Sequence, residues 1–345
     1  MRVVLGIESS CDETAAALVT SERQILAQRI ASQDEEHAPY GGVVPEIAAR
    51  AHAEKLAPMI AAVLDEAGVE LSDLDAIAAT AGPGLIGGVM VGLVSAKALA
   101  MASGVPLLAM NHLEGHALSP RLADAELGFP YALLLVSGGH CQILQVDGVE
   151  QYRRLATTID DAIGEAFDKT AKILSLGYPG GPAVERLARE GDPQAVPLPR
   201  PLVGSKEPHF SFAGLKSAVL RAKEKGVHRD ADIAASFQQA AVDCVIDRLT
   251  YSLDSEERLP ALVVAGGVAA NSAIRTALEG FARARDMRFV APPLALCTDN
   301  AAMIAWAGLE RLSVGGAADP LDFRARPRWP LDPDAEPVRG AGYKA

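Results

Sequence analysis

Residues 2–20 carry the sequence RVVLGIESSCDETAAALVT, in which two apolar segments flank a short polar one. Arg2–Glu8 predicts a buried strand, Ser9–Glu13 a turn, and Thr14–Thr20 a strand that returns beside the first. The hydroxyls and backbone amides of such a turn can hold a phosphate, although its two carboxylates oppose one. An ordinary acidic hairpin turn explains the same residues equally well.

The same pattern of strand, polar turn and strand begins again at Tyr131. Tyr131–Val136 predicts an apolar strand, Ser137–His140 a turn with two glycines, and Cys141–Val146 a returning strand. Glycines in such a turn let the backbone approach a ligand closely. Two hairpins of this kind, each opening a lobe, predict a duplicated α/β architecture with a nucleotide cleft.

The composition narrows the class of protein. A length of 345 residues favours two lobes, and 49% hydrophobic with only 5% aromatic residues suits packed α/β layers of small side chains. The net charge of −12 argues against a surface that binds polyanions non-specifically. A specific RNA substrate would therefore require a local basic patch or a helper protein. Reduced thiols in a cytoplasmic protein are expected, because no Cys-x-x-Cys pair occurs among Cys11, Cys141, Cys244 and Cys297.

An uncharged stretch from Ala76 to Ala96 is long enough to raise the question of a membrane span. Five glycines and Pro83 interrupt it, which predicts a short strand, a tight loop and a close-packed helix instead. The apolar run Val3–Ile7 is too short for a signal peptide. We therefore expect no membrane association.

Two histidines lie four residues apart in Asn111-His112-Leu113-Glu114-Gly115-His116. On a helix they share one face and could share one metal ion, although this spacing also occurs without any metal. Zinc peptidases carry a glutamate directly after the first histidine, a position that is Leu113 here. A metal would require a third ligand from elsewhere, expected to be a carboxylate, and an open position for substrate.

Further polar residues allow two interpretations each. Asp161, Glu165 and Asp168 share one face of a predicted helix, which is usually solvated but can bind hydroxyls or a metal. Leu262–Asn271 predicts a strand, a Gly-Gly turn and a helix, a setting that suits a nucleotide. Asp299 is either a helix N-cap or the missing carboxylate ligand.

Three segments of the second half have uncertain roles. The proline-rich excursion Pro193–Pro208 predicts a surface loop or a mobile lid. Phe210 and Phe212 precede several basic residues, as in contacts to single-stranded RNA, although core packing of the two rings is the favoured alternative. Near the end of the chain lies a small basic and aromatic cluster of Arg324, Arg326, Arg328 and Trp329.

Taken together, these segments resemble the TsaD/Gcp family of tRNA N6-adenosine threonylcarbamoyltransferases. The resemblance spans essentially the whole chain. It runs through Gly6–Thr14, Gly41–Glu46, Ala81–Leu85, His112–His116, Leu135–His140, Asp160–Thr170, Tyr178–Pro182, Phe210–Lys216, Ala265–Asn271, Cys297–Asn300 and Arg326–Leu331.

The resemblance implies an actin-like ATPase (ASKHA) fold with two duplicated lobes around a nucleotide cleft, approximately 1–118 with 301–345 and 119–300. It also implies one divalent metal ion, Fe²⁺ or Zn²⁺, held by His112, His116 and Asp299. The implied contacts to L-threonylcarbamoyladenylate are Leu135, Val136, Ser137, Gly138, Gly139, Asp168, Gly181 and Asn271. Asn111 replaces a histidine common in related bacterial sequences, and we expect no change in activity from it.

The implied reaction transfers the threonylcarbamoyl group from that adenylate to N6 of the adenosine at position 37 of tRNAs that read ANN codons, releasing AMP. The adenylate is already activated, so no protein nucleophile is needed. No catalytic residue is assigned beyond the metal centre, and His140 and Asp12 are two conceivable proton acceptors. Implied partners are a catalytically degenerate actin-like paralogue, a small P-loop ATPase and a separate adenylate synthase.

Three other functions compete with this one. A metallopeptidase would use the histidine pair, but lacks the glutamate at position 113. A non-catalytic ATP-binding scaffold would share the fold and have no use for the predicted metal ligands. An O-carbamoyltransferase for a small molecule would share the metal chemistry, although its relatives are typically larger.

Overall fold

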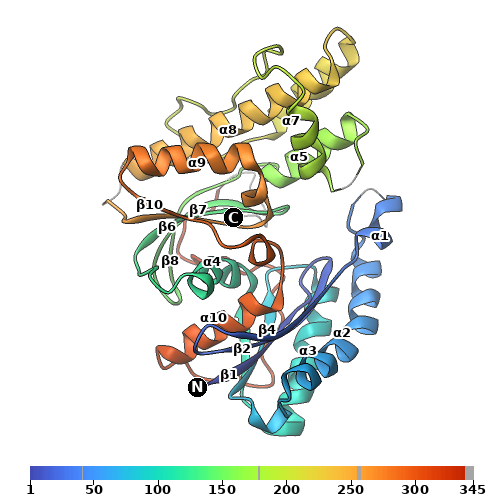
Figure 1. The fold of residues 1–345 in the computed structure, drawn as a ribbon, viewed down its shortest axis with the longest axis vertical. Coiled ribbons are helices and arrows are strands. Elements are labelled where there is room, and N and C mark those ends of the chain that lie inside the picture. The colour runs from blue at the N-terminus through green and yellow to red at the C-terminus, as the bar shows by residue number, and fades with distance from the viewer. Residues whose placement is uncertain (41, 178, 255–257, 339–345) are drawn as a thin grey trace. The chain divides into compact units, whose positions relative to one another are not determined.

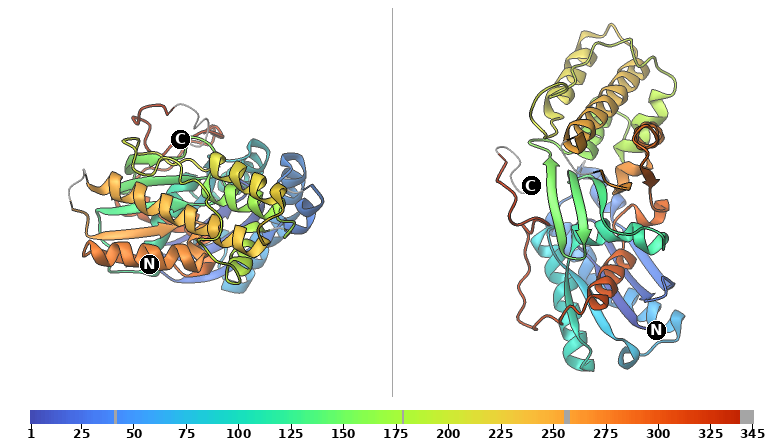
Figure 2. Two further views of the ribbon diagram at one scale, coloured as in Figure 1. Left: turned by 90° about the horizontal axis from the view of Figure 1, so that it is seen from above. Right: turned by 90° about the vertical axis from the view of Figure 1, so that its left-hand side faces the viewer.

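The computed structural model describes the chain except residues 41, 178, 255–257 and 339–345. The chain divides into two compact units. Unit 1 comprises Met1–Gly128, Gly148–Gln151 and Pro292–Pro333, and unit 2 comprises Phe129–Asp147, Tyr152–Ala291 and Asp334–Ala345. Each unit holds one five-stranded sheet with helices packed on it (Figures 1 and 2). The lobe boundaries expected from the sequence stay a prediction.

The sheet of unit 1 has the order β3-β2-β1-β4-β5. The predicted hairpin is confirmed, because β1 and β2 pair antiparallel from Val3 opposite Thr20 to Glu8 opposite Ala15. Strands β4 and β5 continue the sheet in parallel. The strands are β1 (Val3–Glu8), β2 (Glu13–Thr20), β3 (Ile25–Ser32), β4 (Ala76–Gly82) and β5 (Leu107–Asn111).

Helices cover both faces of this sheet, with α2 and α3 on one side and α10 on the other (Figure 1). Gly6 lets α10 lie directly on β1, because a Cβ at Gly6 would stand 2.1 Å from the Ala301 carbonyl oxygen. The helices of unit 1 are α1 (Asp34–His37), α2 (Pro45–Ala67), α3 (Ile86–Ser103), α4 (His112–Ala123) and α10 (Ala301–Ser313), with 3₁₀ turns η1 (Ala38–Tyr40), η2 (Leu71–Asp73) and η4 (Leu294–Leu296).

The sheet of unit 2 has the order β10-β9-β6-β7-β8, which repeats the arrangement of unit 1. Again an antiparallel hairpin, β6 with β7, continues on one side into a third strand and pairs on the other side with a parallel strand. The predicted duplication is thus confirmed. The elements are β6 (Tyr131–Val136), β7 (Cys141–Gly148), β8 (Gln151–Thr157), α5 (Ile163–Ile173), α6 (Gly180–Ala188), α7 (Ala213–Lys225), α8 (Asp230–Asp254), β9 (Ala261–Ala265), η3 (Gly267–Ala270), α9 (Ser272–Ala284) and β10 (Arg288–Val290).

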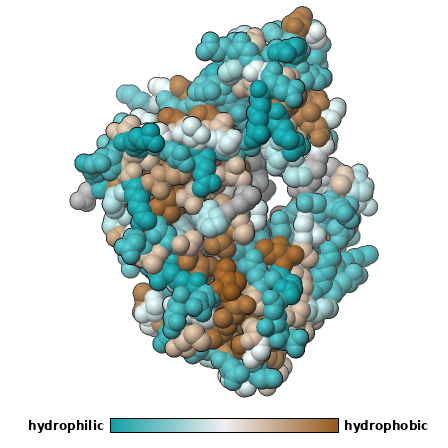
Figure 3. All heavy atoms as spheres, in the orientation of Figure 1, coloured by the Kyte–Doolittle hydropathy of each residue, from teal (hydrophilic) through white to brown (hydrophobic). Residues whose placement is uncertain are grey.

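The uncharged stretch Ala76–Ala96 forms β4, a loop and the first part of α3, as predicted. Helix α3 is long and apolar enough to cross a membrane by length and composition alone. One face of it is buried, however, and packs against β4 and α2. About a third of its residues are buried inside the protein. Hydrophilic side chains cover much of the face of the molecule shown in Figure 3.

The proline-rich excursion Pro193–Pro208 is a surface loop that is anchored along α8. The amide of Val196 donates to Ser236 Oγ over 3.1 Å, and Arg200 Nε donates to Asp243 Oδ2 over 2.9 Å. The fully buried Arg248 of α8 reaches the carbonyls of Ser205 and Glu207. These anchors favour the surface loop over the mobile lid.

The two phenylalanines before α7 are buried, at 1% and 0% exposure, and stack with ring centroids 6.1 Å apart. Core packing, the favoured alternative, is therefore confirmed for Phe210 and Phe212. Two of the basic residues that follow form ion pairs within unit 2, Lys216 with Asp161 and Lys223 with Asp230. These four residues thus have structural roles.

A buried chain of hydrogen bonds links α1 to the turn between β1 and β2. His37 Nε2 lies 3.1 Å from Gln33 Oε1, Gln33 Nε2 lies 3.3 Å from His52 Nδ1, and His52 Nε2 lies 3.1 Å from the Cys11 carbonyl oxygen. Because carbonyl oxygens only accept and an amide nitrogen only donates, both imidazoles carry their proton on Nε2. Gln33 thereby connects the two rings, and the Thr14 hydroxyl is a second partner of His52 Nδ1, at 2.8 Å.

Gln33→Leu is expected to lower the free energy of unfolding by about 1–3 kcal/mol, because it leaves the buried Nε2 of His37 without its hydrogen-bond partner. Chemical denaturation of both proteins measures the change. Gln24→Leu, at an exposed site in the same unit, is the matched control and should change the midpoint little. A wild-type midpoint for Gln33→Leu would show that the chain of bonds contributes nothing.

Candidate metal centre

Helix α4 begins where β5 ends, and Asn111 forms the junction. Its side-chain oxygen accepts the Leu113 amide over 2.9 Å, so Asn111 is the N-cap of α4. Its amide nitrogen donates to the Trp329 carbonyl over 3.0 Å. Gly115 allows close packing on α10, because a Cβ there would lie 2.8 Å from Ile304 Cδ1. The first turns of α4 are thus fixed at both their start and their inner face.

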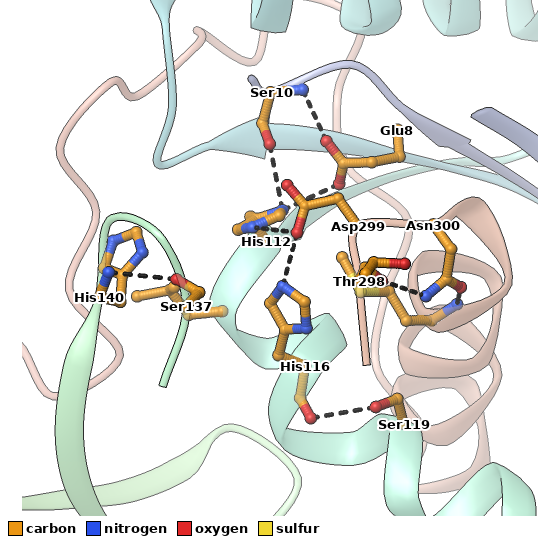
Figure 4. A network of polar contacts seen from close by, with 12 residues as sticks. Glu8, Ser10, His112, His116, Ser119, Ser137, His140, Thr298, Asp299 and Asn300 are labelled. Atoms are coloured by element: carbon orange, nitrogen blue, oxygen red, sulfur yellow. Dashed lines mark hydrogen bonds and ion pairs between the residues drawn. The ribbon is translucent and has the colours of Figure 1, made fainter. Parts of the chain in front are cut away.

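The structure brings together the three predicted metal ligands (Figure 4). His116 Nε2 lies 2.9 Å and His112 Nε2 3.6 Å from Asp299 Oδ1, and all three ligand atoms lie within 4.8 Å of one another. Both histidines are buried, and the Asp299 side chain retains 19% exposure. Two imidazole nitrogens with one carboxylate oxygen form a donor set that suits Zn²⁺ or Fe²⁺. The residues present therefore fit the implied metal.

Asp299 can take this role because its neighbour caps the next helix. Asn300 Oδ1 accepts the Met303 amide over 2.9 Å at the start of α10. The N-cap alternative for Asp299 is therefore wrong. The sequence places Asp299 and Asn300 side by side, and either side chain can cap a helix, so residue type alone could not decide between them.

Glu8 is a member of the site that sequence reasoning missed. It is fully buried at the end of β1, and its Oε2 lies 3.0 Å from His112 Nδ1. The Ser10 amide and the Thr80 hydroxyl also donate to this carboxylate, over 2.6 and 2.5 Å. When Nδ1 donates to Glu8, the Nε2 lone pair of His112 faces Asp299, the arrangement by which carboxylates orient metal-binding histidines. The available signal was a single charge in the otherwise apolar strand Val3–Glu8.

The site concentrates negative charge. Burial would lower the pKa of His112, but the carboxylates of Asp299 and Glu8 raise it to about 9. Burial and the nearby carboxylates of Asp299 and Asp12 raise the pKa of Glu13 to about 10. Burial and Asp299 likewise raise the pKa of Asp12. Mutual repulsion of this kind is relieved by a bound cation, which supports the fit to a metal.

The predicted substrate contacts all belong to unit 2. Gly164 lets α5 start beside the glycine turn, because a Cβ there would lie 2.5 Å from the Ser137 carbonyl oxygen. Gly266, which follows β9, lies equally close to Val136, because a Cβ at Gly266 would stand 2.3 Å from the Val136 carbonyl oxygen. Open space surrounds the Cβ positions of Gly138, Gly139 and Gly181. The glycine turn therefore has room for a ligand.

Two predicted contacts already have structural partners. Asp168 Oδ1 accepts the Gly180 amide over 2.9 Å and so joins α5 to α6. Asn271 is the N-cap of α9, and its amide nitrogen donates to Gln238 Oε1 over 3.0 Å. Leu135 and Val136 are buried at the end of β6, so they can offer only backbone atoms and apolar surface.

The chain matches one family of enzymes along its length. Residues 24–306 match the family model TsaD, described as tRNA N6-adenosine threonylcarbamoyltransferase. The enzyme of that name from Erythrobacter litoralis (strain HTCC2594) is 82% identical over 345 residues, covering 100% of both chains. The one from Novosphingobium aromaticivorans is 75% identical over 351 residues, again covering 100% of both.

Solved structures agree on the fold. Full-length HypF in its phosphate- and nucleotide-bound form has a TM-score of 0.62 at 14% identity, over 92% of this chain and 47% of that one. Component A of the Acidaminococcus fermentans (R)-2-hydroxyglutaryl-CoA dehydratase has a TM-score of 0.54 at 15% identity, over 91% of this chain and 100% of that one. These neighbours confirm the predicted actin-like ATPase (ASKHA) fold.

Proposed function

Because the chain belongs to the TsaD family of tRNA N6-adenosine threonylcarbamoyltransferases, we propose that His112, His116 and Asp299 hold the divalent metal ion of that activity. The enzyme transfers the threonylcarbamoyl group from L-threonylcarbamoyladenylate to N6 of adenosine 37 in tRNA and releases AMP. The observation that carries the metal proposal is the convergence of three buried or half-buried ligand atoms within 4.8 Å. The proposed metal is Fe²⁺ or Zn²⁺, since this donor set suits both.

The activated adenylate needs no nucleophile from the protein, so the residues of the site bind and orient. The metal, when bound, supplies Lewis-acid stabilisation of the negative charge on the phosphate or carbamoyl oxygens. Glu8 holds the His112 ring, so that its Nε2 stays directed at the site. Helix α4 and the cap Asn111 hold both histidines at a fixed spacing.

The adenylate binds at the glycine turn of unit 2. Backbone amides of Ser137, Gly138 and Gly139 hold the phosphate and carbamoyl oxygens, which is supported by the open space around both glycines. Asp168 and Asn271 contact the nucleoside hydroxyls or base, with Leu135, Val136 and Gly181 beside them.

Reconstitution tests this proposal. Labelled threonine, bicarbonate, ATP, the synthase, all bacterial partners and unmodified tRNA are combined with intact, chelator-stripped or metal-refilled protein. Label should reach the anticodon-loop adenosine with intact and refilled protein, and fall to background with stripped protein. Full transfer by protein shown to contain no metal would overturn the proposed role of the three ligands.

The observations favour this function over the metallopeptidase and scaffold alternatives. Family membership supplies an acyl-transfer activity that needs no glutamate at position 113. A scaffold gives no reason for His112, His116 and Asp299 to converge in the interior of unit 1.

The proposed protein partners are the degenerate actin-like paralogue and the small P-loop ATPase, in the cytoplasm. An exposed apolar stripe on α3 supports the paralogue as a docking partner. Ile86, Met90 and Val94 are 51%, 45% and 50% exposed and follow one another at helical spacing. A second actin-like protein with its own apolar helix would bury this stripe.

Val94→Arg is expected to weaken binding of the purified paralogue at least about tenfold, because it places a charge within a desolvated interface. Isothermal titration measures the affinity. Val314→Arg is the matched control, because Val314 is also exposed in unit 1 but lies outside α3. Equal affinity for Val94→Arg and wild type would remove α3 from the interface.

A further inference from the structure

The basic and aromatic cluster near the end of the chain forms a defined feature of unit 1, residues Phe323–Trp329, which we name the arginine strap. Arg324, Arg326 and Arg328 alternate along this irregular segment, and all three are exposed. Within the described part of the chain, none of the three forms an ion pair with a carboxylate. Three uncompensated positive charges thus stand together on a protein with a net charge of −12.

The strap is held in place by its backbone. The Arg326 amide donates to the Ala81 carbonyl over 2.7 Å, and the Pro327 carbonyl accepts the Gly84 amide over 3.3 Å. Gly82 must be a glycine, because a Cβ there would lie 1.8 Å from the Arg326 carbonyl oxygen. This segment therefore presents its side chains from a fixed position, which lowers the entropic cost of binding a partner.

Aromatic side chains fix the central arginine. The Arg326 guanidinium lies 4.8 Å from the ring centroids of both Phe323 and Trp329. Phe323 and Trp329 in turn pack on a small apolar cluster that includes Ala81, Leu93 and Ala109. Arg326 thus serves mainly to stiffen the strap, while Arg324 and Arg328 on either side have no such partner among the described residues.

The strap lies beside the metal centre within unit 1. The Trp329 carbonyl accepts the side-chain amide of Asn111, the residue that caps α4 and directly precedes the ligand His112. The loop under the strap also touches the turn after β1, because the Leu85 amide donates to the Ser10 carbonyl over 2.8 Å. One hydrogen bond therefore separates the strap from the helix that carries two metal ligands.

We propose that the arginine strap binds the sugar-phosphate backbone of the tRNA substrate, with Arg324 and Arg328 on phosphates. The proposal rests on the tRNA-modifying activity and not on the identity of the metal. An acidic protein repels tRNA unless local cations neutralise the phosphates that come closest. Phosphate contacts fix position without reading sequence, which suits an enzyme that accepts several tRNAs. A strap attached to α4 holds the tRNA at the surface beside the ligands.

The test uses the double variant Arg324→Ala with Arg328→Ala in the full chain. Binding of unmodified tRNA is titrated between about 50 and 200 mM salt, where each phosphate contact contributes roughly 0.7–0.9 to the slope of log K against log salt. The slope should fall by about 1.4–1.8 for two contacts. In the complete transfer system, KM for tRNA should rise at least about tenfold while kcat stays within about twofold.

Two further variants separate charge from structure. Arg324→Lys with Arg328→Lys keeps both charges and should restore the salt slope. Arg283→Ala, at an exposed arginine on α9 of unit 2, is the matched control and should leave the slope unchanged. An unchanged slope and KM in the double alanine variant would overturn the proposal, as would an equal effect of Arg283→Ala. Because binding is titrated without adenylate, this outcome is independent of the metal proposal.

Discussion

Asp299→Ala is expected to lower metal affinity by more than roughly 100-fold, beyond the 10–100-fold loss that changes in outer-shell partners cause. Threonylcarbamoyl transfer should fall to background in the same preparation. The reason is that Asp299 supplies the only carboxylate oxygen in the ligand set found among the described residues. The fold should persist, because the side chain is 19% exposed and its loss relieves repulsion from Asp12 and Glu13.

Metal content by elemental analysis, competition with a chelator and the thermal midpoint together measure this prediction. Asn300→Ser is the matched control at the neighbouring position, because serine also caps a helix and should preserve metal binding. Wild-type metal occupancy in Asp299→Ala would remove this residue from the site. A lost fold in Asp299→Ala would instead show that Asp299 is needed for folding, contrary to its assignment as a ligand.

Glu8→Gln is expected to have the second largest effect, a loss of metal affinity of about 10–100-fold. Glutamine has the same shape, but its amide nitrogen cannot accept the hydrogen bonds that Ser10, Thr80 and His112 direct at the carboxylate. The His112 ring then loses the partner that fixes its Nδ1 proton. Raising the metal concentration should restore transfer in this variant, whereas it should not in Asp299→Ala.

Thr80→Val provides a graded control, because it removes one donor to Glu8 and keeps the carboxylate. Its metal affinity should fall between those of wild type and Glu8→Gln. If Glu8→Gln bound metal as tightly as wild type, Glu8 would be a structural residue of β1 without influence on the metal.

Much of this architecture could be predicted from local sequence. The hairpins at Arg2–Thr20 and Tyr131–Val146 follow from apolar strands around polar turns, and the structure confirms both. The pairing of His112 with His116 follows from helical spacing. These features depend on residues close together in the chain, for which periodicity is informative.

The rest depends on contacts between distant segments. Glu8 meets His112 because β1 and β5 lie on either side of β4, which no local pattern encodes. From the sequence, either Asp299 or Asn300 could cap α10, and the structure shows that Asn300 does so. Asn111 could be judged only as a departure from relatives, whereas the structure shows it capping α4 and holding Trp329. The family resemblance implied Asp299 as a metal ligand, whereas only the structure shows that Glu8 contacts His112.

The most direct test of the metal centre is an anomalous difference map from crystals of the natively purified protein, recorded at the Fe and Zn absorption edges. We expect one peak per chain, in contact with His112 Nε2, His116 Nε2 and Asp299 Oδ1. A fully occupied metal peak elsewhere in the protein, with these three side chains bonded only to one another, would contradict this expectation.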